Sequence, residues 1–92
     1  MTFEWDEAKS RANRIKHGLD FAAALRFDWE SALVADRTRH ADGEPRFAAL
    51  GILDAKLYTI VFTRRGRNVR IISMRRSNPK EEKAHESAKK KN

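Results

Sequence analysis

Arginine is the residue type in this chain best suited to chemistry, and six arginines lie close together between residues 64 and 76. The guanidinium group is planar, stays charged at any biological pH, and offers paired N–H donors that match phosphate oxygens. Each arginine alone would be ordinary surface charge. The six are Arg64, Arg65, Arg67, Arg70, Arg75 and Arg76. As a cluster they predict a surface that binds a polyanion.

Composition favours the same class of partner. The 92 residues carry a formal charge of +7, which attracts nucleic acid, an anionic membrane or an acidic protein. No apolar run is long enough to span a bilayer, and the first residues do not resemble a signal peptide, so a membrane is the least favoured partner. The lack of cysteine excludes thiolate metal sites and disulfides and fits a cytoplasmic protein.

A predicted β-hairpin holds the arginine cluster. Residues 57–62 and 69–74 are rich in β-branched and aromatic side chains, and they flank a turn at Gly66. Strands would fix the guanidinium groups on a rigid frame.

Two helices are predicted before the strands. Asp6 can cap a helix that ends at Gly18, and Asp20 can cap a shorter one over residues 21–27. The first helix has an apolar face at helical spacing, formed by Ala8, Ala12, Ile15 and Leu19. The second is expected to bury Phe21, Ala24 and Leu25.

Two further strands and a last helix complete the predicted fold. Residues 32–38 and 46–53 are extended in pattern, with a turn over residues 40–45 and a tight connection over residues 54–56. Asn78, Pro79 and Glu81 form the start of a helix, with Glu81 as capping-box partner. The prediction is an α+β domain over residues 1–88, in which two N-terminal helices pack on a four-stranded antiparallel sheet. Residues 2–5 could add a short leading strand, and residues 89–92 a frayed lysine-rich tail.

The central strands are apolar on both faces. Two short helices can cover only one face of the sheet, and Ala84 and Ala88 give the last helix little apolar surface. We therefore expect a protein partner on the second face.

Short motifs follow one another along nearly the whole chain. They are Phe3-Glu-Trp-Asp6, Lys9, Asn13, Lys16-His-Gly18, Gly43-Glu44-x-Arg46-Phe47, Tyr58-Thr…Arg64, Arg70-Ile-Ile-Ser-x-Arg75 and Glu81. In this order and spacing they resemble the BrnT toxins of bacterial type II toxin–antitoxin pairs. The resemblance implies a RelE-like fold and a ribonuclease that needs no metal or other cofactor, cleaves RNA and arrests growth. It also implies a cognate antitoxin, BrnA, whose ribbon-helix-helix domain carries the pair to operator DNA.

Cleaving RNA without a metal requires a base for the 2′-hydroxyl, cations for the charge that builds on phosphate, and an acid for the leaving oxygen. Arg64 and Arg75 are the expected cations, because they follow the apolar runs of the hairpin. Histidine suits the proton transfers. His85 is one candidate, although the BrnT family tends to carry a tyrosine there. His17 is the other, although a cation at a helix end also has a structural use.

RNA binding is expected from the remaining basic residues of the hairpin and of the first helix. They are Arg65, Arg67, Arg76, Lys16 and Lys9. Asp36, His40, Asp42 and Glu44 crowd one turn, but their spacing matches no metal motif, and no metal is expected. Two alternatives remain open: a non-catalytic nucleic-acid-binding or ribosome-associated module, and a basic protein that binds an acidic partner.

Overall fold

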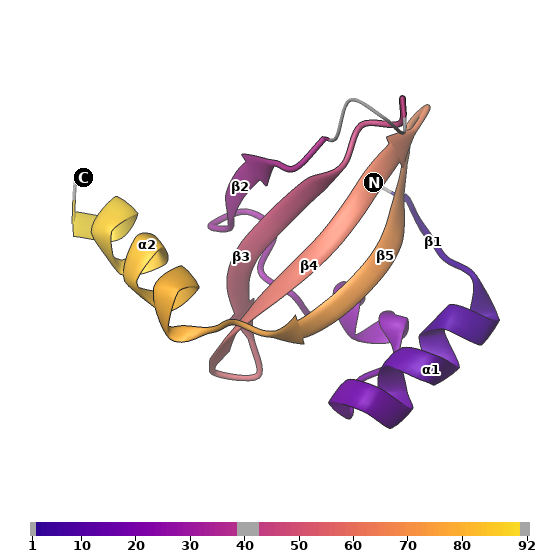
Figure 1. Ribbon diagram of the computed structural model, residues 1–92, viewed down its shortest axis with the longest axis horizontal. Helices are drawn as coiled ribbons and strands as arrows, with labels where there is room; N and C mark the ends of the chain where they lie inside the picture. The colour runs from indigo at the N-terminus through magenta and orange to yellow at the C-terminus, as the bar shows by residue number, and fades with distance from the viewer. Residues whose placement is uncertain (1, 39–42, 91–92) are drawn as a thin grey trace.

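The computed structural model describes residues 2–38 and 43–90 of the chain (Figure 1). The elements in chain order are β1 (Thr2–Glu4), α1 (Glu7–His17), the 3-10 helix η1 (Phe21–Leu25), β2 (Leu33–Asp36), β3 (Phe47–Leu53), β4 (Lys56–Arg65), β5 (Asn68–Arg76) and α2 (Pro79–Lys90). The fold is α+β, as predicted. Neither helix of these described ranges is long and apolar enough to cross a membrane.

The sheet has five strands in the order β1-β5-β4-β3-β2. Strands β2 to β5 are antiparallel neighbours, as the sequence predicts. The leading strand also forms, but it pairs in parallel with β5, with Thr2 opposite Asn68. The prediction of a purely antiparallel four-stranded sheet is therefore wrong, and the sheet is mixed. The sequence gives no local sign of this pairing, because the two strands lie at opposite ends of the chain.

Tight turns join the central strands. Between β3 and β4, Asp54 and Ala55 both have positive φ angles, of 49° and 68°. Paired left-handed residues suit a two-residue hairpin, because their twist matches that of the flanking strands. Between β4 and β5, Gly66 supplies the left-handed residue with a φ of 61°. Both β4 and β5 are longer than predicted and contain five of the six clustered arginines.

Helix α1 begins and ends as predicted, but its apolar face is not the face that it buries. The Asp6 carboxylate accepts the Lys9 N–H at 3.1 Å, and Gly18 (φ 81°) donates its N–H to Arg14 O at 2.8 Å. Ile15, however, is 88% exposed, and the buried residues of α1 are Ser10 and Asn13. The helix packs through polar side chains.

Asn13 explains this orientation of α1. Strand β1 ends its pairing at Arg70, so the Met74 N–H on the same edge of β5 lies beyond it. The Asn13 amide oxygen accepts that N–H at 3.1 Å, and its nitrogen donates to Leu19 O at 2.8 Å. A buried backbone N–H without a partner costs about 1–3 kcal/mol, so this hydrogen bond favours the orientation of α1 that turns Asn13 toward β5.

The second predicted helix is the 3-10 helix η1. With three residues per turn, Phe21 and Ala24 share one face, and both are buried as predicted. Leu25 is rotated off that face and is 68% exposed, so its predicted burial is wrong.

The hydrophobic core lies between η1 and one face of the sheet. Phe21 and Phe27 pack against residues of β3, β4 and β5, including Ile60 and Met74. Gly51 has no side chain where Phe27 crosses β3, and an added Cβ would lie 2.6 Å from the Phe27 ring. This layer leaves the opposite face of the sheet, here called the open face, for α2 and for solvent.

Helix α2 begins with the predicted capping box. Asn78 Oδ1 accepts the Glu81 N–H at 2.8 Å, and Glu81 Oε1 accepts the Asn78 N–H at 2.9 Å. Lys89 and Lys90 belong to its last turn, not to the expected frayed tail, and residues 91–92 lie outside the described ranges. Figure 1 shows α2 standing off the β2–β3 side of the sheet, with α1 at the opposite end of the molecule.

Candidate active site

A groove of about 480 Å³ separates α2 from the open face of the sheet. Its floor includes a row of side chains that runs across four strands: Leu33, Leu50, Thr59 and Arg75. Its wall is the first turns of α2, which contribute Lys80, Glu81 and Ala84. We call this cavity the α2 groove.

Arg75 lies in the α2 groove and is held by Glu81. Its Nη1 and Nη2 atoms donate to the two carboxylate oxygens of Glu81 at 2.7 and 2.9 Å. The Arg75 side chain is 38% exposed and that of Glu81 is 11% exposed. The hydrogen bond to Glu81 raises the pKa of Arg75, so the guanidinium is charged at every biological pH.

Glu81 is fixed from several sides. The hydrogen bond from Arg75 is the main cause that lowers the pKa of Glu81 to about 2, against the opposing effect of burial, and the Asn78 N–H adds to the lowering. Beneath it, the hydroxyl groups of Thr59 and Ser77 lie 2.8 Å apart and join β4 to the end of β5. Glu81 is therefore a carboxylate at neutral pH and has no proton to donate.

Two more cations line the α2 groove with Arg75. Arg37 follows β2 at one end, and Lys80 lies beside Glu81 at the other. Cations set in advance around a groove stabilise the negative charge that builds on a reacting phosphate. Sequence reasoning missed both residues. The alternation Leu33, Ala35, Arg37 along one strand was the available sign for Arg37.

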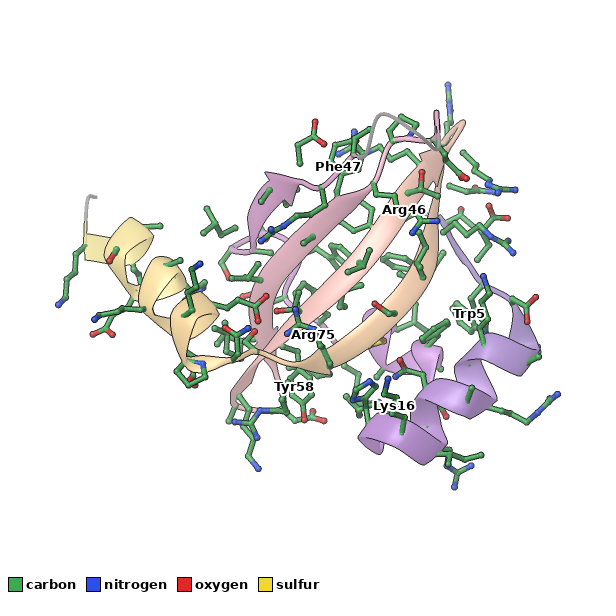
Figure 2. The ribbon with its side chains drawn as sticks, in the orientation of Figure 1. Trp5, Lys16, Arg46, Phe47, Tyr58 and Arg75 are labelled. Carbon is green, nitrogen blue, oxygen red and sulfur yellow. The ribbon has the colours of Figure 1, made fainter. Side chains whose placement is uncertain are left out.

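Arg46 is a further residue that sequence reasoning missed as a site candidate. Figure 2 shows Arg46 and Arg75 over the same face of the sheet, with Arg46 toward the far end of β4. The Arg46 Nε atom is buried, and no described residue accepts its proton. A buried N–H donor without a partner is costly, so Arg46 is held in this position against an energetic cost.

The structure does not bring Arg64 and Arg75 together. Arg64 lies on the core face, with its Cζ atom 5.8 Å from the centre of the Phe47 ring. It pairs across the hairpin with Val69, whereas Arg75 pairs with Thr59. The alternation of side chains along β4 explains the result, because Arg64 follows the face of Phe62 and not that of Thr59.

The other predicted RNA-binding arginines are also dispersed. Arg65 forms an exposed ion pair with Glu44 at 3.3 Å, and Arg67 is exposed in the turn between β4 and β5. Arg76 lies over the Tyr58 ring, with 5.6 Å from its Cζ atom to the ring centre. The six arginines therefore do not form one surface.

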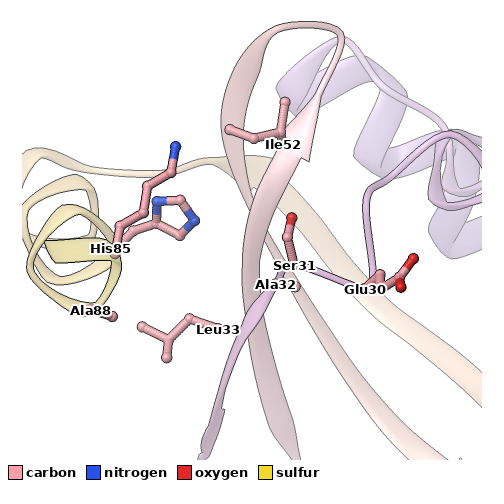
Figure 3. Close-up of a pocket in the computed structure, with 8 residues that line it drawn as sticks. Glu30, Ser31, Ala32, Leu33, Ile52, His85 and Ala88 are labelled. Atoms are coloured by element: carbon pink, nitrogen blue, oxygen red, sulfur yellow. The ribbon is translucent and has the colours of Figure 1, made fainter. Parts of the chain in front are cut away.

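Histidines do not line the α2 groove among the described residues. His85 lines a second groove, of about 420 Å³, farther along α2, with Leu33, Ile52 and Ala88 (Figure 3). His17 is exposed in the last turn of α1, where its structural use at a helix end applies. His40 lies outside the described residues. The predicted pair of proton-transfer histidines is thus placed at two separate sites.

Lys9 and Lys16 are exposed on α1. Figure 2 shows Lys16 near the end of this helix, away from α2. Within residues 2–38 and 43–90 no three side chains of histidine, cysteine, aspartate or glutamate are grouped as a metal site would need. Asp42, one of the crowded turn residues, lies outside these ranges.

The α2 groove combines a fixed arginine, two further cations and an ionised carboxylate, which suits work on a phosphodiester. Comparison with known proteins points the same way. No curated protein sequence matches the chain. A family model does match over residues 5–81, and its description is a ribonuclease toxin, BrnT, of type II toxin–antitoxin systems. The match covers most of the sequence, from just after β1 through α1 and β2 to β5 as far as the start of α2, and on this ground the chain belongs to the BrnT family of ribonuclease toxins.

Proposed function

We propose that this chain is an endoribonuclease that cleaves RNA in the α2 groove without a metal ion. The observation that carries the proposal is the Arg75 guanidinium, which lies in the groove beside Arg37 and Lys80 and is fixed by Glu81. These side chains supply positive charge where other nucleases use a magnesium ion. The order of helices and antiparallel strands also supports the RelE-like fold that the family resemblance implies.

The proposed reaction is attack of a ribose 2′-oxygen on the adjacent phosphorus, as its proton passes to water. The bond from phosphorus to the 5′-oxygen of the next nucleotide breaks, and that oxygen takes a proton from water. Charge on the phosphate oxygens grows in the transition state, so cations placed beforehand accelerate the step. Arg75 is the proposed catalytic residue, and Arg37 and Lys80 the proposed contacts to the flanking RNA. A role for His85 in proton transfer stays a prediction, since it lines the neighbouring groove, which shares only Leu33 with the first.

The metal-free reaction is tested with the purified chain and a labelled RNA. We expect cleavage to continue at the same rate in excess EDTA, because the groove holds its own cations. Added magnesium should not raise the rate. Loss of activity in EDTA, restored by magnesium, would contradict the proposed mechanism. RNA that is bound but never cleaved would favour the alternative of a non-catalytic nucleic-acid-binding module.

We further propose that the activity arrests growth and that a cognate antitoxin of the BrnA type neutralises it. Membership of a type II toxin family supports the partner, and operator DNA would be reached only through the ribbon-helix-helix domain of the antitoxin. The proposed location of this activity is the cytoplasm, because the proposed substrate is cellular RNA. The open face supports the docking position, because Leu33 and Ile52 are exposed beside the two grooves.

A further inference from the structure

The contacts of Arg75 divide its N–H donors into two groups. The end of the guanidinium, formed by Nη1 and Nη2, donates to both oxygens of Glu81. Nη1 also donates to Arg76 O at 3.4 Å, on the edge away from Nε. None of the described residues accepts a hydrogen bond from Nε. The Nε–H and the outer Nη2–H, which lie on the same edge of the guanidinium, are thus both without an acceptor among the described residues.

This remaining edge has the geometry of an anion fork. Guanidinium groups bind carboxylate or phosphate with two parallel N–H donors, either from the end or from the side. Glu81 takes the end of Arg75, so only the side is left for a second anion. Arg75 lines the α2 groove, which is about 480 Å³ in volume and could hold a second anion against this side chain.

We propose that Glu81 is a positioning residue for Arg75, holding the guanidinium by its end so that the Nε–Nη2 side receives the phosphate at the cleavage point. The inference rests on the proposed ribonuclease function and adds to it the residue that orients the catalytic cation and the edge that meets the substrate.

Glu81 is built to do this because its own position is fixed. Its carboxylate accepts the Asn78 N–H while its backbone N–H is capped by the Asn78 side chain, so both ends of the residue are held. Glu81 belongs to the first turn of α2, so a side chain at a rigid helix start holds the Arg75 guanidinium. We call this ion pair the clamp on Arg75. An arginine without such a clamp has several free torsions, and a misplacement of about 1 Å at a reacting centre can reduce the rate about a hundredfold.

A purely structural role is the simpler alternative, in which the ion pair only attaches α2 to β5. The two roles differ in one respect. If Glu81 acts through Arg75 on the substrate, its replacement matters for catalysis only while Arg75 is present. A structural contribution would persist, or change stability alone, whichever side chain stands at position 75.

The kinetic test is a double-mutant cycle on RNA cleavage with Glu81→Gln, Arg75→Lys and the double variant. Glutamine preserves the capping box and the size of the side chain but removes the charge. We expect Glu81→Gln to lower kcat about tenfold with KM changed less than about twofold, and to have almost no further effect beside Arg75→Lys. Glu82→Gln, at the exposed next position, is the matched control and should cleave like the parent. A parent-like Glu81→Gln, or equal effects in both backgrounds, would overturn the inference.

A second measurement does not depend on cleavage. In the nitrogen-15 NMR spectrum, the Nε–H signal of Arg75 is identified by its loss in Arg75→Lys. Adding a 2′-O-methyl RNA, which cannot be cleaved, should shift that signal in the parent and shift it much less in Glu81→Gln. If the Nε–H signal of the folded parent does not shift when the RNA is added, the inference is overturned. This outcome can be measured even if Glu81→Gln proves unstable. If the signal shifts but the parent cleaves no RNA, the proposed function fails while the clamp on Arg75 stands.

Discussion

At the scale of single residues, a comparison of Arg75 with Arg64 tests the proposed catalytic role of Arg75. Arg75 lines the α2 groove, whereas Arg64 lies over Phe47 on the other face. We expect Arg75→Lys to lower kcat/KM for RNA roughly a hundredfold, because lysine lacks the planar fork of donors. This corresponds to a loss of about 3 kcal/mol of transition-state stabilisation. Arg64→Lys, with the same change of side chain, should stay within a few-fold of the parent. Cleavage assays beside circular dichroism decide this, and an equally inactive, folded Arg64→Lys would return Arg64 to the site.

Asn13 and Ile15 provide a second comparison of single residues. Asn13→Ala leaves the Met74 N–H and Leu19 O without their partner, and each lost hydrogen bond of a buried group costs about 1–3 kcal/mol. Ile15→Ala removes an exposed side chain, so its effect should be within about 0.5 kcal/mol. Urea unfolding of both variants measures the difference. A destabilised Ile15→Ala with an unchanged Asn13→Ala would show that α1 packs through its apolar stripe.

These residues also show what local sequence could and could not predict. The caps Asp6, Gly18 and Asn78 act on neighbours in the chain, and their predicted roles are confirmed. Asn13 acts on Met74, far along the chain, so its burial had no local sign. The face of Arg64 could have been predicted, since strand alternation places it with Phe62.

At the scale of elements, the attachment of α2 should depend on pH through Glu81. Its pKa is about 2 in the folded chain and about 4.5 in the unfolded chain, so the unfolded state takes up the proton first as the pH falls. The ion pair therefore stabilises the fold fully above about pH 5 and loses this contribution between pH 5 and 2. The loss of free energy of unfolding should be about 1 to 3 kcal/mol. The lower value applies if solvent screens the ion pair, because Arg75 is partly exposed.

Unfolding by urea at several pH values measures this effect. The decline toward acid should be shallower in Glu81→Gln than in the parent. Other carboxylates with lowered pKa values, among them Asp28 and Asp36, remain in both proteins and cancel in the comparison. Glu86→Gln, on the exposed part of α2, serves as control and should follow the parent. Parallel curves for Glu81→Gln and the parent would mean that the pair contributes no net stability.

Elements built from consecutive strands were predictable, whereas those defined by distant contacts were not. The hairpin β4–β5 and the strand before it follow from side-chain pattern and from turn residues such as Gly66. The parallel pairing of β1 had no such sign. The groove depends on the angle at which α2 leaves β5, and the capping box sets where that helix begins but not its direction.

At the scale of the whole molecule, two exposed apolar residues in different places can be compared as docking positions for the antitoxin. Leu33 lies between the two grooves beside α2, and Ile15 lies on α1 in the other layer. If the antitoxin covers the open face, Leu33→Glu should weaken the complex, because it buries a charge in the interface. Ile15→Glu introduces the same charge elsewhere and should leave the complex intact.

Co-expression with the neighbouring antitoxin gene and size-exclusion chromatography measure both variants. The parent and Ile15→Glu should elute as a complex, and Leu33→Glu should release free antitoxin. The reverse pattern would move the docking surface to α1, where Ile15 of the apolar face is exposed to solvent. A parent that never forms a complex would remove the antitoxin from the proposal.

The parallel pairing of β1 with β5 also orders events during protein synthesis. Thr2–Glu4 are made before the other described strands, yet within the described residues their strand neighbour is Asn68–Arg70. Until β5 is made, β1 has no strand to pair with, so no hydrogen bonds offset the entropy cost of closing the long intervening chain. The same strand carries Arg75, so β1 gains its partner only while the proposed cleavage site is being completed. A nascent chain that stops before β5 therefore has neither the closed sheet nor Arg75, the residue proposed for catalysis.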